Sequence, residues 1–178
     1  MGSGKSAVGK QLSRMLDMQF YDSDTEIERI TGVDIAFIFE KEGEAKFRER
    51  ESEVIDSLTQ LNGIILATGG GAVLSAATRE YLKERGRVVY LQTSVEQQLE
   101  RTKQTRHRPL LQTVNPEQRL RDLLACRAPL YEAIATITIS TDHRRVPAVA
   151  ADVINGLGLV AHNKIELIKF DDHATHEH

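Results

Sequence analysis

The chain has one cysteine, Cys126, among its 178 residues, and this scarcity excludes a class of folds. A single cysteine cannot form an intrachain disulfide, so the chain is not a small disulfide-stabilised secreted domain. The N-terminus also lacks the pattern of a cleaved signal peptide. We therefore expect a reducing, cytoplasmic location.

Long hydrophobic runs and an excess of positive charge are lacking too. The apolar stretch over residues 63–78 is interrupted by a glycine triplet and stays short of the about 18 apolar residues that a membrane-spanning helix needs. The formal net charge is −3, whereas surfaces that bind nucleic acid are usually basic. We expect neither a membrane nor a nucleic acid as partner. Hydrophobic residues make up 40% of the chain, which suits one α/β domain with a well-buried core.

The first seven residues form a glycine-rich segment that leads directly into a helical pattern. The sequence Met1-Gly2-Ser3-Gly4-Lys5-Ser6-Ala7 holds the second half of the phosphate-binding signature Gly-x-x-x-x-Gly-Lys-Ser/Thr, without its first glycine. A flexible linker is the alternative, but it would not be followed by apolar residues at helical spacing. We predict that the loop binds phosphate through its N–H groups, that Lys5 contacts the β and γ phosphates, and that Ser6 ligates Mg²⁺.

Two aspartates follow the next apolar segment. Residues 19–21 are predicted to form a short strand, and Asp22-Ser23-Asp24 comes directly after it. Ligands of parallel α/β sheets bind at the C-terminal ends of the strands. Asp22 is therefore placed to order a magnesium ion, and Asp24 to act as a base toward an acceptor hydroxyl. The alternative role for Asp24 is a helix N-cap, because a helical pattern begins at Thr25.

The helix predicted over residues 44–61 carries charged residues on its apolar side. Glu51 lies on the stripe formed by Phe47, Val54, Ile55, Leu58 and Leu61, and Arg48 lies one turn before Glu51. Because a buried carboxylate needs a partner, we interpret Arg48 and Glu51 as a pocket wall whose guanidinium can bind a substrate carboxylate. A surface ion pair is the alternative, and we accept it for Glu49 and Arg50.

Two further segments have unusual compositions. The apolar run over residues 64–67 reads as a buried strand and ends in Thr68-Gly69-Gly70-Gly71. Three glycines at a strand end indicate that a ligand approaches the backbone closely, with a plain turn as the alternative.

Residues 103–114 contain basic side chains and no acid. This composition predicts a lid that closes on a bound polyphosphate. An RNA-binding patch is the alternative, but interleaved aromatic residues are lacking.

In this order and spacing, the motifs resemble those of the shikimate kinase family. The resemblance is carried by the glycine-rich loop, Tyr21-Asp22-Ser23-Asp24, Phe47-Arg48, Ala67-Thr68-Gly69-Gly70-Gly71, Arg108-Pro109-Leu110-Leu111 and Arg127-Ala128-Pro129-Leu130-Tyr131. It implies an α/β P-loop kinase fold with a parallel sheet and helices on both faces. It also implies transfer of the ATP γ-phosphoryl group to the 3-hydroxyl of shikimate, which gives shikimate 3-phosphate in aromatic amino acid biosynthesis.

The resemblance also implies roles for individual residues. ATP would bind to Gly2, Ser3, Gly4, Lys5, Ser6, Ala7, Arg101, Arg108 and Arg144, with Arg101 and Arg144 on the adenine side and Arg145 as the alternative to Arg144. Mg²⁺ would bind to Ser6 and Asp22. Together with the interpretations above, the shikimate site would comprise Asp24, Arg48, Glu51, Gly69, Gly70, Gly71 and Arg127. The catalytic residues would be Lys5, Asp24 and Arg108. We expect the protein to be a monomer.

The domain organisation follows from the same motifs. We assign residues 1–158 to the kinase domain, with acceptor-binding helices over residues 25–61 and the lid over residues 103–114. Residues 159–178 form a C-terminal tail for which we expect little order. The first strand of the family, which lies in the middle of its sheet, has no counterpart in this sequence. We therefore expect the natural chain to start upstream of Met1, and the 178-residue form to be loosely folded with weak ATP binding.

Two other functions remain open at this point. A gluconate kinase-like enzyme of the same fold would also use Arg48 and Arg127 to bind the carboxylate of a sugar acid. A nucleotide-binding protein without turnover would need neither Asp24 nor these arginines.

Overall fold

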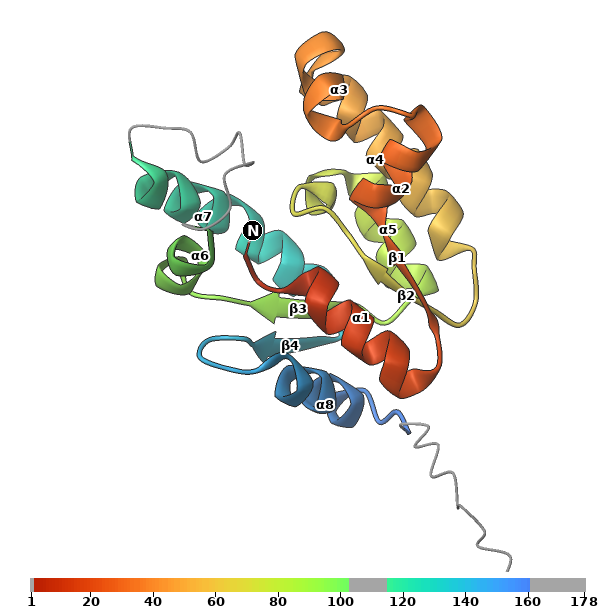
Figure 1. The fold of residues 1–178 in the computed structure, drawn as a ribbon, viewed down its shortest axis with the longest axis vertical. Coiled ribbons are helices and arrows are strands. Elements are labelled where there is room, and N and C mark those ends of the chain that lie inside the picture. Colours follow the sequence, from red (N-terminus) through yellow and green to blue (C-terminus); the bar gives the residue numbers. More distant parts are fainter. Residues whose placement is uncertain (1, 103–114, 161–178) are drawn as a thin grey trace, which may run out of the picture.

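The computed structural model describes residues 2–102 and 115–160. The predicted lid, which contains Arg108, and the tail from residue 161 onward lie outside them. Two pairs of parallel strands form the centre (Figure 1). Strand β1 (Gln19–Asp22) pairs with β2 (Ile64–Ala67), and β3 (Val89–Gln92) pairs with β4 (Ile137–Ser140). Within the described ranges, no ladder of hydrogen bonds joins one pair to the other.

Helices connect the strands and cover them. In chain order they are α1 (Lys5–Leu16), α2 (Ser23–Thr31), α3 (Ile35–Lys41), α4 (Gly43–Thr59), the 3₁₀ helix η1 (Ala72–Leu74), α5 (Ala76–Arg85), α6 (Val95–Thr102), α7 (Pro116–Ile134) and α8 (Val146–Gly156). Across residues 2–102 and 115–160, no helix combines the length and the apolar character that crossing a bilayer requires.

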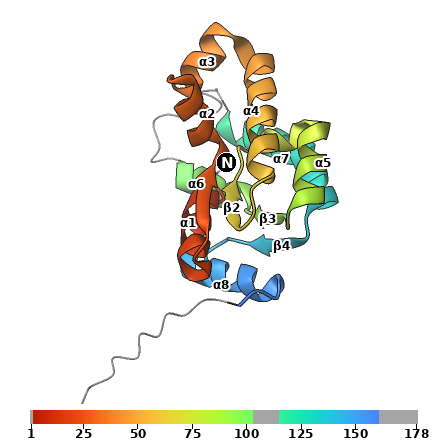
Figure 2. The same cartoon turned by 90° about the vertical axis from the view of Figure 1, so that its right-hand side faces the viewer.

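Adjacent residues of β2 pack on opposite faces, as the alternation of a strand dictates. Ile65 contacts a cluster in which α1 contributes Val8, Leu12 and Leu16 and α8 contributes Val149, Ala150, Val153 and Ile154. Leu66 contacts a second cluster, built from Ile27, Ile38, Phe47, Val54 and Leu58 of α2, α3 and α4. Figures 1 and 2 show α1 and α8 apart from the α2–α4 group. The predicted α/β fold, with parallel strands and helices on both faces, is confirmed.

Two sequence-based expectations about the core are wrong. Leu61 was placed on the buried stripe of α4, but it is 46% exposed because the helix ends at Thr59 and no longer presents it to the core. Strand β2 was expected to be fully buried, yet its first three residues are only half-buried although helices pack on both of its faces. Its one hydrogen-bonded neighbour in the described ranges is β1, so one edge of the strand has no adjoining strand to cover it.

Candidate active site

The glycine-rich loop turns sharply before α1 begins. Gly2 and Gly4 have φ angles of 71° and 84°, a region that residues with a side chain seldom adopt. Gly4 is the N-cap of α1, and no side chain caps the helix there. The first N–H groups of α1 lack partners within the helix and, with the helix dipole, can bind an anion. The geometry is that of a phosphate-binding loop.

Ser6 and Asp22 bring this loop to the end of β1. Ser6 Oγ donates a hydrogen bond of 2.7 Å to Asp22 Oδ2. Asp22 Oδ1 accepts from the backbone N–H of Asp24 at 3.1 Å, which makes Asp22 the N-cap of α2. The capping role considered for Asp24 is therefore wrong. Hydroxyl and carboxylate oxygens are ligands that Mg²⁺ prefers, and it commonly takes only one or two of them from the protein, so Ser6 and Asp22 fit this ion.

Asp24 and Glu51 meet beside the glycine triplet. Asp24 Oδ1 and Glu51 Oε1 are buried and lack a hydrogen-bond partner within the described ranges. A Cβ atom built on Gly69 would lie 2.8 Å from Asp24 Oδ1 and would overlap Glu51 Oε1. Glycine at this position therefore lets the two carboxyl groups approach the same point.

Burial governs the protonation of both carboxyl groups. Desolvation raises the pKa of Asp24, the negative charge of Asp22 raises it further, and Lys5 opposes the rise. Desolvation likewise raises the pKa of Glu51, against the attraction of Arg48. A carboxylate whose pKa is moved toward neutrality is a stronger base than an ordinary aspartate.

The guanidinium of Arg48 is held by two carboxylates of its own helix. Arg48 Nη1 donates to Glu51 Oε2 at 2.5 Å. Arg48 Nε and Nη2 both donate to Glu44 Oε1, at 3.4 Å and 3.1 Å. Burial disfavours the charge of Arg48, but Glu51 and Glu44 outweigh this effect and raise its pKa. The predicted position of Glu51 on the buried side of the helix is confirmed, since only 2% of its side chain is exposed, and Arg48 is the ion-pair partner of this buried carboxylate.

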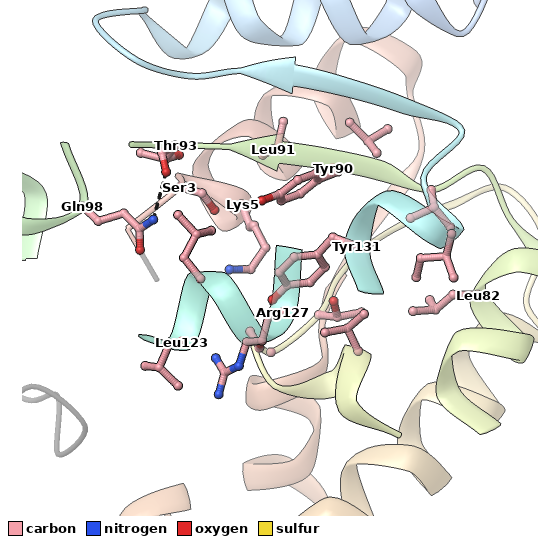
Figure 3. Close-up of a pocket in the computed structure, with 18 of the residues that line it drawn as sticks. Ser3, Lys5, Leu82, Tyr90, Leu91, Thr93, Gln98, Leu123, Arg127 and Tyr131 are labelled. Atoms are coloured by element: carbon pink, nitrogen blue, oxygen red, sulfur yellow. Dashed lines mark hydrogen bonds between the residues drawn. The ribbon is translucent and has the colours of Figure 1, made fainter. Parts of the chain in front are cut away.

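Helix α7 contributes a second arginine and a tyrosine. Arg127 is 8% exposed, and within the described residues no hydrogen bond or ion pair links its guanidinium to a carboxylate. Tyr131, one turn further along, donates a 2.5 Å hydrogen bond to the carbonyl of Gly70. Its ring stacks on Tyr90 with centroids 4.9 Å apart (Figure 3). These contacts fix α7 against the glycine triplet, where Arg127 Nη1 would be 3.7 Å from a Cβ on Gly70.

Two further contacts hold the surrounding loops. Ser23, which is fully buried, accepts a 3.0 Å hydrogen bond from the N–H of Gly69 through its Oγ. Arg101 Nη1 donates to the carbonyl of Gly2 and to Thr141 Oγ1, both at 3.0 Å, and Nη2 donates to the carbonyl of Thr141 at 2.7 Å. The phosphate-binding loop is thereby connected to α6 and to the segment after β4.

A cavity of about 1130 Å³ extends from the phosphate-binding loop to the glycine triplet and Arg127. Most of the predicted site residues line it, namely Gly2, Gly4, Lys5, Ser6, Ala7, Asp22, Asp24, Arg48, Glu51, Gly69, Gly70, Gly71, Arg101 and Arg127. Helix α3 adds Ile35 and Phe39. Ser3 lines a smaller adjoining cavity of about 110 Å³, which Figure 3 shows with Lys5, Arg127 and Tyr131 around it.

One predicted residue lies elsewhere. Arg144 is paired with Asp152 of α8 and lines neither of these cavities, so its contact with adenine stays a prediction. The contact of Arg101 with adenine stays one as well. The role of Arg108 is likewise untested, because this residue lies outside the described ranges.

The sequence-based prediction did not single out several residues that have clear structural roles. Tyr131 follows Arg127 by four residues and so lies on the same helix face, a signal that could have identified it. Glu44 precedes Arg48 by four residues in the same way. No local signal marks Ser23 or Thr141, because their partners are distant in the chain.

Comparison with known proteins identifies relatives of this chain in sequence and in structure. The family model described as shikimate kinase matches residues 1–157. The shikimate kinase of Alteromonas mediterranea is 52% identical over 159 residues, which cover 89% of this chain and 93% of the relative. A structure of shikimate kinase from Acinetobacter baumannii in complex with shikimate superposes with a TM-score of 0.85 at 52% identity, covering 88% of each chain. The shikimate kinase structure from Aquifex aeolicus gives a TM-score of 0.75 at 34% identity, covering 89% of this chain and 91% of that one. The chain belongs to the shikimate kinase family.

Proposed function

We propose that this chain transfers the γ-phosphoryl group of ATP to the 3-hydroxyl group of shikimate. The observation that carries the proposal is the environment of the Arg127 side chain. Arg127 is 8% exposed, no carboxylate of the described residues forms a hydrogen bond with its guanidinium, and it lines the same cavity as the phosphate-binding loop. The charge of Glu51 attracts Arg127 without a hydrogen bond between them, so the planar donors of Arg127 are available to an anionic acceptor at this end of the cavity. The solved relative from Acinetobacter baumannii holds shikimate, a carboxylic acid, which supports this choice.

The loop end of the cavity would hold the nucleotide. The N–H groups at the start of α1 and the ammonium group of Lys5 would bind the β and γ phosphates. Ser6 and Asp22 would hold Mg²⁺, which when bound neutralises charge on the phosphate oxygens. Arg101, tied to the carbonyl of Gly2, would fix the loop in its binding conformation.

The other end would hold the acceptor. Arg48, Arg127 and the N–H of Gly70 would bind the carboxylate of shikimate and so orient its 3-hydroxyl toward Asp24 and the γ phosphate. Asp24 would accept the hydroxyl proton while the hydroxyl oxygen bonds to the γ phosphorus and the bond to the β-phosphate oxygen breaks. The products are ADP and shikimate 3-phosphate. All these residues belong to one chain, so we propose that a monomer suffices.

A coupled assay of ADP release tests the proposal. The full chain is incubated with MgATP and with shikimate, gluconate or no acceptor. We expect release that depends on shikimate and saturates with it, and background release in the other two reactions. Release with gluconate alone would assign a different sugar acid, and equal release in all three would leave only an ATPase.

A further inference from the structure

Glu44 occupies the side of the Arg48 guanidinium that is best suited to a carboxylate. Nε and Nη2 are the two parallel donors of that side, and a single oxygen, Glu44 Oε1, accepts from both. A bidentate carboxylate needs two such donors. The other two-donor edge of the guanidinium is formed by Nη1 and Nη2, and Nη1 is already bound to Glu51.

The two glutamates differ in how easily they can release Arg48. The Glu51 side chain is 2% exposed, and breaking a buried ion pair leaves an unpaired charge without water. The Glu44 side chain is 60% exposed, so water can solvate its carboxylate when the pair opens, and the pair is weak. Exchange of one carboxylate for another at Arg48 is therefore feasible at Glu44 and not at Glu51.

We propose that Glu44 is an internal competitor that occupies the carboxylate position on Arg48 and lowers the affinity for the acceptor. The inference rests on the proposed function and deepens its acceptor site. An acceptor carboxylate that binds to Nε and Nη2 must displace Glu44, so its apparent affinity is the intrinsic affinity multiplied by the fraction of molecules in which the Glu44–Arg48 pair is open. Glu44 does not contact the reacting atoms, and it therefore acts on the KM for shikimate and not on kcat.

Replacement of Glu44 gives a signed prediction. Glu44→Gln and Glu44→Ala should lower the KM for shikimate by about two- to fivefold, the size expected for an exposed ion pair. The kcat and the KM for ATP should stay unchanged. If Glu44 instead pre-organises Arg48 for the substrate, the same variants raise the KM.

Glu49 provides a matched control. It lies on the same helix, its side chain is also 60% exposed, and it pairs with Lys46 instead of Arg48. Glu49→Gln changes the net charge of α4 by the same amount as Glu44→Gln. A general electrostatic effect on an anionic acceptor therefore lowers the KM in both variants, whereas displacement from Arg48 lowers it only in the Glu44 variants.

The experiment measures shikimate-dependent ADP release for the full chain and for all three variants. A KM in the Glu44 variants equal to or above that of Glu49→Gln overturns the proposal. Absence of shikimate-dependent turnover in the parent counts against the proposed function instead. In that case, calorimetric titration of the same four proteins with shikimate decides the role of Glu44 by the same comparison of affinities.

Discussion

Asp24 Oδ1 and Glu51 Oε1 reach the same point beside Gly69, and neither accepts a hydrogen bond from the described part of the chain. Both carboxyl groups are buried, and the pKa of each is raised by desolvation. The base proposed for the reaction is therefore held next to a second acid in a small space that exists only because position 69 has no side chain.

Gly69→Ala should disrupt this arrangement. The added methyl group would overlap Glu51 Oε1 and press on Asp24 Oδ1, so both carboxyl groups must shift. We expect kcat/KM for shikimate to fall by about tenfold or more, because small displacements of catalytic groups are costly. Gly86→Ala is the comparison, since Gly86 follows α5 in an extended conformation, lines neither cavity, and its Cβ would lie 3.4 Å from the Leu82 carbonyl oxygen. A loss in Gly86→Ala as large as that in Gly69→Ala would contradict this account.

Asp24→Asn tests the proposed base. The amide cannot accept the hydroxyl proton, so turnover should fall by roughly 10²-fold or more, with the KM for ATP nearly unchanged. In the parent, activity requires the ionised carboxylate. Because the pKa of Asp24 is raised above its ordinary value of 3.8, activity should already decline with acidification at a pH higher than an ordinary aspartate would give. Near-normal turnover of the variant would remove Asp24 from the mechanism.

The same variant should be more stable than the parent at neutral pH. A carboxyl group whose pKa is raised on folding contributes stability below its unfolded pKa, and this contribution is lost as the pH rises through the folded pKa. The asparagine side chain of the variant carries no charge, and its amide can donate to Glu51 Oε1, a hydrogen bond worth about 0.5–1.5 kcal/mol. Thermal unfolding at neutral pH should therefore show a higher Tm for the variant, by about 1–6 °C. The gain should shrink toward pH 4, and a Tm at or below that of the parent at neutral pH would show that ionised Asp24 is not a net cost.

Tyr131→Phe tests the link between α7 and the glycine triplet. The variant keeps the ring stack with Tyr90 and loses the hydrogen bond to the Gly70 carbonyl. We expect the unfolding free energy to fall by about 0.5–1.5 kcal/mol and the KM for shikimate to rise more than the KM for ATP. Tyr90→Phe is the matched control, because it keeps the same stack and removes no hydrogen bond recorded for the described residues. Equal effects in both variants would reduce Tyr131 to a packing role.

Local patterns were enough to predict much of this site. Glu51 was assigned to the buried face of α4, with Arg48 one turn before it, because helical periodicity fixes which residues share a face. Capping was harder to assign, since Asp22 and Asp24 both precede Thr25, where the helical pattern of the sequence begins. Only the structure shows that Asp22 is the cap. Leu61 was misplaced because helix ends are less certain in sequence than helix faces.

Contacts between distant parts of the chain could not be predicted in this way. Tyr131 and Gly70 are 61 residues apart, and Arg101 and Gly2 are 99 residues apart. Such contacts depend on how the helices pack on the strands, which periodicity does not specify. The same holds for the meeting of Asp24 and Glu51, which belong to different helices and come together at Gly69, on a third segment.

The central claim is that Arg127 and Arg48 bind the acceptor carboxylate in the cavity that ends at the phosphate-binding loop. A double-mutant cycle tests it directly, with kcat/KM measured for the parent and for Arg127→Lys, each with shikimate and with shikimate methyl ester. Lysine keeps the charge and loses the planar pair of donors. We predict a loss of about tenfold or more for Arg127→Lys with shikimate, as expected for a charged hydrogen bond, and little further loss with the ester. An equal loss with both acceptors would show that Arg127 does not bind the carboxylate.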